Sequence, residues 1–164
     1  MLKLILAAAA FILCMAAGKV AAEKYGLRQR TLNGLVSDFK VLEAALKYER
    51  TDIKSLADLL AARGSLTELW KKISYELERD AGFDAAWRLH GHELFLENEA
   101  LAVVDGFAKR FGSNDAETEL GRIAGTLRQL EEIERKQCTV FEQKRKLSRS
   151  LSALLGAAFA LLII

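Results

Sequence analysis

The sequence has no proline, and it has only two cysteines and two histidines among its 164 residues. Without proline, no position lacks the backbone N–H that a continuous helix needs. Ala, Leu, Glu, Lys and Arg are abundant, and these residues lose little side-chain freedom in a helix. No alternating pattern of a half-buried strand is present. The sequence therefore predicts an all-α protein.

The shortage of cysteine excludes a disulfide framework and a cysteine metal site. Cys14 lies in an apolar segment near the N-terminus, and Cys138 lies among charged residues of a late helix. We interpret both as filling residues.

Charge is nearly absent from both ends of the chain. Residues 4–22 contain one charged side chain, Lys19, and residues 151–164 contain none. A bilayer core about 30 Å thick requires a helix of about 20 apolar residues. The N-terminal segment meets that length. The C-terminal segment is short, so it requires a thinned bilayer or the stem of Arg149 to reach across. Both ends are predicted to be transmembrane helices.

Basic residues gather at the inner edges of these apolar segments. They are Lys19, Lys24, Arg28 and Arg30 on one side, and Lys144, Arg145, Lys146 and Arg149 on the other. Lys and Arg mark the cytoplasmic flank of a span. The predicted organisation is an N-terminal transmembrane anchor at 1–23, a cytoplasmic helical bundle at 24–149 and a C-terminal transmembrane segment at 150–164.

A cleaved signal peptide is the alternative reading of the N-terminus. Lys3, the apolar stretch and Val20-Ala21-Ala22 before Glu23 would supply its three regions. Against cleavage, Lys19 lies where a cleavage region is normally neutral, and the basic residues after Glu23 oppose export. We favour the uncleaved anchor.

The middle of the chain has no net charge. Lys3 and Lys19 are the only charged residues outside 23–149, so the remaining 22 basic residues balance 22 acidic ones. A nucleic-acid-binding domain normally carries a basic excess, so this balance argues against that function.

Apolar residues spaced by three and four predict several helices in the middle. The first, Leu27 to Tyr48, has one apolar face formed by Leu32, Leu35, Val36, Phe39, Leu42 and Leu46. Only Gly26 separates it from the N-terminal segment. Capping residues predict the next starts: Asp52 for a helix ending at Gly64, the capping box Ser65-Leu66-Thr67-Glu68, and Asp84 before Ala85.

Two further helices complete the predicted antiparallel bundle. One runs through Leu94, Leu101, Val104 and Phe107 and stops near Gly112. The other covers 115–149, with Asn114 to Glu117 as a capping box at its start. Trp70 and Trp87 are interpreted as core anchors rather than ligand-stacking residues.

His90-Gly91-His92-Glu93 is the one segment where metal or acid–base chemistry is conceivable. Histidines two residues apart point to different sides of a helix, unlike the i, i+4 pair of a zinc protease. No third ligand is spaced nearby, so a loop role is favoured. Phosphate loops and nucleophile constellations are also missing. We predict no enzyme activity, cofactor or metal site.

The junction Tyr48-Glu49-Arg50-Thr51 has two readings, a turn or a docking surface for a partner. The residues alone favour the turn.

Several segments resemble the stage III sporulation protein AB family of endospore-forming bacteria. They are Leu32–Thr51, Ala85-Ala86-Trp87, Phe107–Leu120 and Lys144–Gly156. The family's Leu-Gly-x-Ser-Asp element, followed by Gln, appears as Phe111-Gly112-Ser113-Asn114-Asp115, with Glu119 in place of the Gln. Its Tyr-Gly-x-Thr-Pro-Leu turn appears as Tyr48-Glu49-Arg50-Thr51-Asp52-Ile53, without the Gly and the Pro.

The resemblance implies a non-enzymatic platform protein in the mother-cell membrane around the forespore. The family is similar to the cytoplasmic domain of type II secretion platform proteins. It is expected to couple an ATPase, stage III sporulation protein AA, to a channel between mother cell and forespore. Other channel subunits and further copies of the chain are candidate partners, and nucleic acid is not. Tyr48, Glu49 and Arg50 are the candidate partner-binding residues, and Trp87, Phe111, Gly112, Asn114 and Asp115 are the structural motif. The alternative is a two-span scaffold or signalling module unrelated to sporulation.

Overall fold

The computed structural model describes residues 2–49, 52–112 and 115–163, all of which lie in helices or in short connections. Side chains at 2–11, 14, 15, 18, 21, 49, 145, 149, 156 and 159–163 are not described. The elements are α1 (Leu2–Glu49), α2 (Ile53–Arg63), α3 (Thr67–Glu78), α4 (Phe83–His90), the 3-10 turn η1 (Gly91–Glu93), α5 (Asn98–Ala108) and α6 (Ala116–Ile163). Within the described ranges there is no strand, so the all-α prediction is confirmed.

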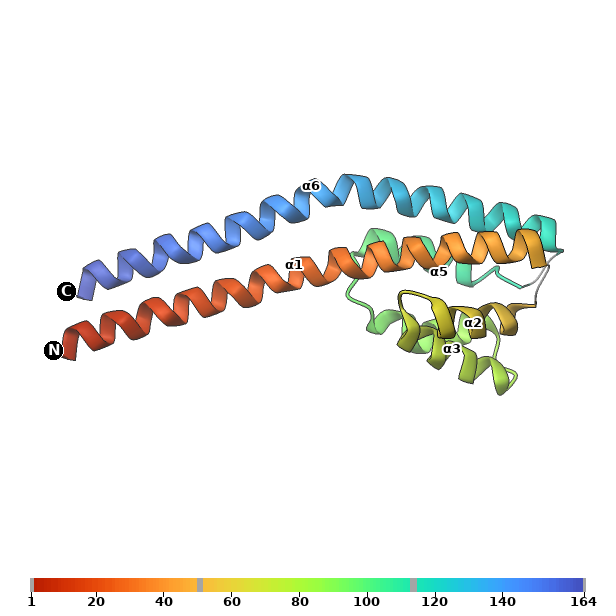
Figure 1. The fold of residues 1–164 in the computed structure, drawn as a ribbon, viewed down its shortest axis with the longest axis horizontal. Helices are drawn as coiled ribbons and strands as arrows, with labels where there is room; N and C mark the ends of the chain where they lie inside the picture. The colour runs from red at the N-terminus through yellow and green to blue at the C-terminus, as the bar shows by residue number, and fades with distance from the viewer. Residues whose placement is uncertain (1, 50–51, 113–114, 164) are drawn as a thin grey trace. The chain divides into compact units, whose positions relative to one another are not determined.

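The chain divides into two units, and α1 and α6 contribute to both (Figure 1). One unit, the terminal pair, consists of residues 1–29 and 136–164. The other, the helical bundle, consists of residues 30–135. Gly26 does not interrupt the first helix, because α1 is unbroken from Leu2 to Glu49.

In the terminal pair, α1 and α6 run antiparallel and contact each other through side chains. The Lys144 ammonium lies 5.9 Å from the centre of the Tyr25 ring. The Gln29 amide nitrogen donates to the Cys138 sulfur at 3.3 Å. Phe141 is buried. Large apolar side chains nevertheless stay exposed on both helices: Ile12, Leu13, Val20 and Leu27 on α1, and Val140, Leu147, Leu151, Leu154 and Leu155 on α6.

In the part of the chain that the structure describes, no helix has a stretch both long enough and apolar enough to cross a membrane. The described parts of the segments predicted as spans, residues 2–23 and 150–163, are thus helical but are not supported as transmembrane helices. Many of their side chains lie outside the described residues, so the spans stay a prediction.

The bundle buries the apolar face that the sequence predicts for α1. Leu32, Leu35, Val36, Phe39, Leu42 and Leu46 are all buried. The long α6 contributes an apolar stripe with the same spacing, since Ile123, Leu127, Leu130 and Ile133 are buried and Leu120 is half-buried. Burial of each such side chain stabilises the fold by about 1.5–3 kcal/mol relative to exposure. Hydrophobic periodicity therefore identified the two helices that frame the bundle.

Two tryptophans anchor the shorter helices in this core. Trp70 on α3 and Trp87 on α4 are each 1% exposed, which confirms their interpretation as core residues. A buried indole needs an acceptor for its N–H. Trp70 Nε1 donates to Asp38 at 2.7 Å, and Trp87 Nε1 donates to Asp105 at 2.7 Å.

The predicted helix boundaries are partly right. Asp52 and Gly64 occupy the N-cap and C-cap positions of α2, as expected. The capping box at Ser65–Glu68 is wrong, because the N-cap of α3 is Leu66 and it makes no side-chain cap. A carboxylate from α1 binds the backbone there instead, as described below.

Two other starts also differ from the prediction. Asp84 does not cap α4, which begins at Phe83 after Gly82. The helix therefore begins two residues earlier than predicted, with the Phe83 ring buried in the core, and Asp84 pairs with Arg88 one turn later. Leu94 was expected inside the helix that leads to Gly112, but its backbone is extended and α5 begins only at Asn98.

Candidate functional site

Asp52 and Ile53, which follow the first segment singled out by the sequence, lie close to Phe111 and Gly112 of the second. The α1–α2 junction and the α5–α6 junction line one hollow of about 480 Å³. Its walls include Leu46 at the end of α1, Ile53 and Leu56 on α2, Phe83 on α4, and Phe111, Gly112 and Glu119 around the start of α6. We call this place the junction hollow. Residues some 60 positions apart in sequence thus form one local structure.

Tyr48 is the described member of the candidate partner-binding residues. Its side chain is 78% exposed, and the Lys47 ammonium lies 5.6 Å from the ring centre. The Glu49 side chain and all of Arg50 and Thr51 lie outside the described residues. Their assignment as a turn or a docking surface therefore stays a prediction. An exposed aromatic ring beside a helix end is suited to contact with a partner.

Phe111 fixes the other junction to the core. Its ring centre lies 5.0 Å from that of Phe83 and 4.6 Å from that of Phe107. Phe107 in turn packs edge-on against Phe39 of α1 at 5.0 Å. Aromatic pairs at these spacings add about 0.5–1.5 kcal/mol beyond their burial. The cluster therefore links α1, α4 and α5 at the junction hollow.

Gly112 follows Phe111 in a conformation that favours glycine. Its φ is +89°, in the left-handed region. A Cβ placed on it would lie 2.1 Å from Ile53 Cδ1, so the side chain of α2 occupies the space that any other residue would need. The helix expected to stop near Gly112 ends already at Ala108, so the left-handed glycine lies in the connection after α5 and does not end the helix itself. Ser113 and Asn114 lie outside the described residues.

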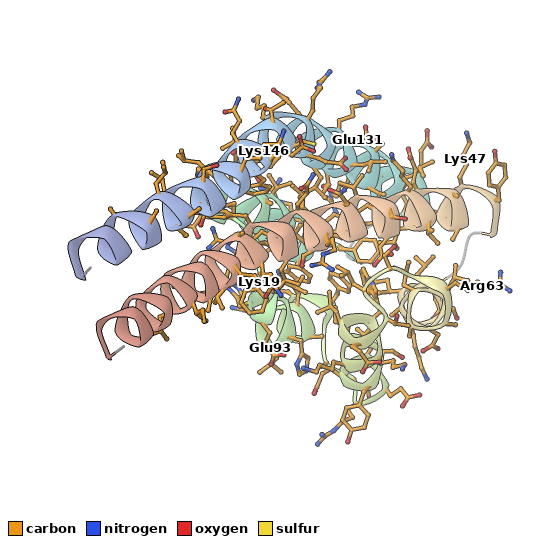
Figure 2. The ribbon with its side chains drawn as sticks, turned by 60° about the vertical axis from the view of Figure 1, so that its left-hand side comes forward. Lys19, Lys47, Arg63, Glu93, Glu131 and Lys146 are labelled. Carbon is orange, nitrogen blue, oxygen red and sulfur yellow. The ribbon has the colours of Figure 1, made fainter. Side chains whose placement is uncertain are left out.

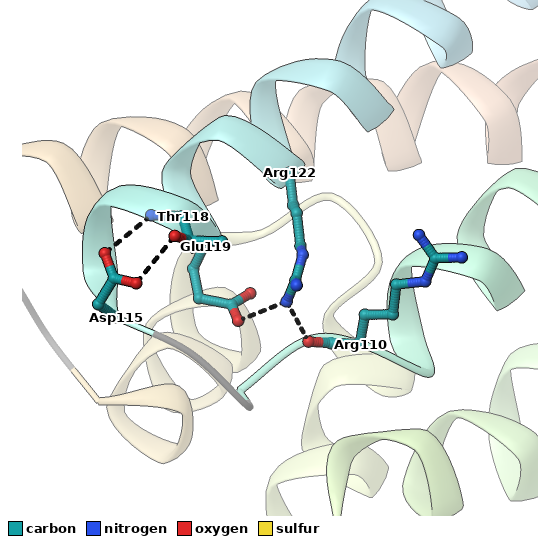
Figure 3. Close-up of polar contacts among 5 residues, drawn as sticks. All are labelled: Arg110, Asp115, Thr118, Glu119 and Arg122. Atoms are coloured by element: carbon teal, nitrogen blue, oxygen red, sulfur yellow. Dashed lines mark hydrogen bonds and ion pairs between the residues drawn. The ribbon is translucent and has the colours of Figure 1, made fainter.

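Asp115 caps α6. Its Oδ2 accepts the Thr118 backbone N–H at 3.2 Å, and its Oδ1 accepts the Thr118 hydroxyl at 2.8 Å (Figure 3). The hydrogen bond from the Thr118 side chain, followed by that from its backbone, holds the pKa of Asp115 below its ordinary value. Asp115 is thus the cap, and the predicted capping box at Asn114–Glu117 is shifted by one residue, because α6 begins at Ala116.

Arg122 connects the start of α6 back to the end of α5. Its guanidinium donates to the Arg110 carbonyl oxygen at 2.6 Å and to Glu119 Oε1 at 2.9 Å (Figure 3). The Glu119 side chain is 6% exposed and lines the junction hollow. A buried carboxylate requires such a cationic partner. Glu119 therefore acts here as an anchoring group for the turn.

The histidine segment consists of the last residue of α4 and the η1 turn, at the end of α4 away from Phe83. His90 Nε2 lies 3.5 Å from a Glu76 oxygen, and His92 Nε2 lies 3.5 Å from Asp105 Oδ1. Glu93 pairs with Lys72, and that hydrogen bond lowers the pKa of Glu93. Among the described residues, no three His, Cys, Asp or Glu side chains gather closely enough to hold a metal ion.

Sequence reasoning missed Asp38, a buried carboxylate with three hydrogen-bond donors. It is fully buried, and its two oxygens accept the backbone N–H groups of Ser65 and Leu66 at 2.5 and 3.0 Å. The indole N–H of Trp70 is its third donor. A signal was present in the sequence, because Asp38 lies at the position three after Leu35 and four before Leu42, on the apolar face.

Comparison with known proteins identifies the family. A sequence model described as stage III sporulation protein AB matches residues 3–164. The chain belongs to the stage III sporulation protein AB family. The match covers nearly the whole chain, so the resemblance seen in the sequence segments is confirmed, and the alternative of a protein unrelated to sporulation is not supported.

The fold has a counterpart among solved structures. A structure titled "Stage III sporulation protein AB (SpoIIIAB)" superposes with a TM-score of 0.61 and 18% sequence identity. The match covers 71% of this chain and 97% of that one. At this identity the likeness shows a shared fold. No curated protein sequence matches the chain.

The family's Leu-Gly-x-Ser-Asp element corresponds to Phe111–Asp115, and its described residues are the aromatic anchor, the left-handed glycine and the helix cap. The Gln that follows in the family is replaced by Glu119, which Arg122 binds. The described residues of this segment thus have structural roles in packing and in capping α6.

Proposed function

We propose that the chain is a non-enzymatic membrane platform of a secretion-like sporulation channel. In this role it couples a cytoplasmic ATPase, similar to stage III sporulation protein AA, to the channel between mother cell and forespore. The observation that carries the proposal is the family match over residues 3–164. A platform needs a part that holds the membrane and a part that meets the ATPase, and the chain has a candidate for each.

The terminal pair is the candidate membrane part. Leu13 is 70% exposed and Leu154 is 67% exposed, and they lie in the two apolar ends of the sequence. Exposed apolar side chains of this density on a surface mark an interaction with a membrane or a partner. Because both ends of the chain contribute, attachment through the terminal pair would leave residues 30–135 for other contacts.

The bundle is the candidate ATPase-binding part. Its surface carries charges of both signs, such as Lys47, Arg63, Glu93 and Glu131 (Figure 2). Its buried polar groups serve the fold: Asp38 binds the start of α3, and Glu119 binds Arg122. These assignments support a non-enzymatic role.

We place the ATPase contact at Tyr48, Glu49 and Arg50. Tyr48 is exposed, and the α1–α2 junction that follows it borders the junction hollow. The apolar faces of α1 and α6 are used within the bundle, so the contact is expected to depend on charge. Surface charges are screened over about 8 Å at physiological ionic strength, so added salt should weaken such binding.

Binding of the full chain to its cognate secretion-type ATPase tests the proposal. The variant reverses two charges, Glu49→Lys with Arg50→Glu. A matched control reverses the exposed pair Glu68→Lys with Lys71→Glu on α3. We expect the junction variant to lose affinity, the control to keep it, and the melting temperature to stay unchanged in both. Equal affinity for all three proteins would refute the contact, and no binding by the unmodified chain would refute the coupling role.

A further inference from the structure

The terminal pair carries a band of basic residues at one level of its two helices. Lys24 lies beside Tyr25 on α1, and Tyr25 contacts Lys144 on α6. Lys19 precedes them on α1 and Lys146 follows on α6 (Figure 2). We call Lys19, Lys24, Tyr25, Lys144 and Lys146 the basic collar. All four lysines are exposed.

Charge around the collar has one predominant sign. Residues 19–28 and 142–149 contain seven basic residues and two acidic ones, Glu23 and Glu142. Beyond Glu142 the chain has no acidic residue at all. The collar therefore differs from the bundle, where the charges balance, and it favours an anionic partner.

A hollow of about 510 Å³ lies on the α6 side of the collar. Lys144 and Lys146 supply its positive charge, and Gln143 and Ser150 supply polar donors. The remaining walls are apolar, from Val140 and Leu147. Both of these are exposed, and Leu147 is followed by exposed Leu151, Leu154 and Leu155 toward the C-terminus.

The order of these groups along α6, first positively charged and then apolar, corresponds to the headgroup and the acyl chains of an anionic phospholipid. Ammonium groups and donors suit the phosphate diester, and the leucines that follow suit the acyl chains. Tyr25 is of the residue type that concentrates at the membrane–water interface, where its ring is apolar and its hydroxyl is wet. A water-soluble anion would use the lysines but not the apolar wall.

We propose that the basic collar is a binding site for the headgroups of anionic glycerophospholipids, with Lys144 and Lys146 as the principal contacts. The proposal rests on the membrane attachment in the proposed function and adds lipid selectivity to it. The bilayer surface, rather than a free phosphate, is the ligand source that the apolar wall favours.

The test measures lipid preference in the full chain reconstituted into phosphatidylcholine vesicles. Trace spin-labelled phosphatidylglycerol or spin-labelled phosphatidylcholine is added, and electron paramagnetic resonance gives the fraction of each label that the protein immobilises. We expect an excess of immobilised phosphatidylglycerol with the unmodified chain. Lys144→Gln with Lys146→Gln should remove most of that excess, and added potassium chloride should reduce it.

Lys71→Gln with Lys72→Gln on α3 is the matched control, because it also removes two exposed lysines and should keep the excess. Circular dichroism should show the same helix content for both variants. Equal immobilisation of the two labels by the unmodified chain would overturn the proposal, as would an excess that persists in the collar variant. An excess that inorganic phosphate abolishes, but chloride at matched ionic strength does not, would also overturn it by indicating a free-anion site.

Flotation separates this inference from the function on which it rests. If the chain floats with phosphatidylcholine vesicles but shows no preference for phosphatidylglycerol, membrane attachment stands and only the lipid-binding role of the collar is refuted. A chain that does not float with vesicles of either lipid refutes the attachment, and the collar proposal falls with it.

Discussion

Both the backbone conformation at position 112 and the side chain packed against it require glycine there. The left-handed φ of +89° costs other residues about 1–3 kcal/mol. Ile53 on α2 also occupies the space where a Cβ would lie. The junction hollow therefore depends on the absence of a side chain at this position.

We expect Gly112→Val to lower the free energy of unfolding by about 1 kcal/mol or more, through strain and the clash with Ile53. Thermal or urea unfolding of the full chain measures it. Gly106→Ala is the matched control, because a Cβ on that helical glycine meets nothing within 4 Å. It should be neutral or stabilising. Equal stability of the Val variant and the unmodified chain would contradict the assigned turn.

Asp115 makes the stability of the α6 start depend on pH. Its pKa is lowered in the folded chain, mainly by the Thr118 side chain, so its ionised form stabilises the fold. That contribution is fully present above the unfolded pKa, about 4, and is lost as pH falls through the lower folded value. Asp115→Ala should therefore melt below the unmodified chain at neutral pH. The gap should close as the pH falls below about 4. Melting curves from pH 7 to pH 3 measure it, and a gap constant with pH would exclude the ionised cap.

At the scale of single helices, Asp38 shows where sequence patterns stop being sufficient. Ser65-Leu66-Thr67-Glu68 has the form of a capping box, yet the N–H groups of Ser65 and Leu66 are bound by Asp38 from another helix. Local spacing describes contacts within one turn, whereas this cap joins residues 27 and 28 positions apart. A prediction from spacing alone could not distinguish the two.

Two substitutions distinguish these caps experimentally. Asp38→Ala should destabilise the chain by about 3 kcal/mol or more, because it leaves buried donors, including the Trp70 indole, without an acceptor. Ser65→Ala should change stability little, whereas a true capping box would lose about 1 kcal/mol. Urea unfolding followed by tryptophan fluorescence reads both. A larger loss of unfolding free energy for Ser65→Ala than for Asp38→Ala would contradict this assignment and support the capping box.

The predictable part of the fold is the part set by periodicity. The apolar face of α1, the stripe of α6 and the core positions of Trp70 and Trp87 follow from spacing and side-chain size. In the candidate site, Gly112 and Asp115 were found because turn and cap chemistry is local. The hydrogen bonds from Arg122 to the Arg110 carbonyl and to Glu119 were not predicted. The bond to Arg110 depends on how α6 packs beside the end of α5, which local spacing does not describe.

At the scale of the whole molecule, the distribution of charge predicts an orientation in the membrane. Basic residues border the apolar ends on the side of the bundle, and Lys and Arg are retained on the cytoplasmic side of a bilayer. The predicted orientation would put the proposed lipid-binding collar at the cytoplasmic headgroup level. Topology thus bears on both the platform role and the collar.

Fusions of the chain to topology reporters test this orientation. A fluorescent protein that folds only in the cytoplasm should be active when fused after Gly64, and alkaline phosphatase, active only outside, should be inactive there. After Ile164 the activities should reverse, if 150–164 crosses the bilayer as predicted. Replacing Lys19, Lys24 and Arg28 with Gln should weaken the orientation at Gly64, because the retained positive charges are what oppose export. Phosphatase activity after Gly64 in the unmodified chain would place the bundle on the other side of the membrane, where a cytoplasmic ATPase could not reach it.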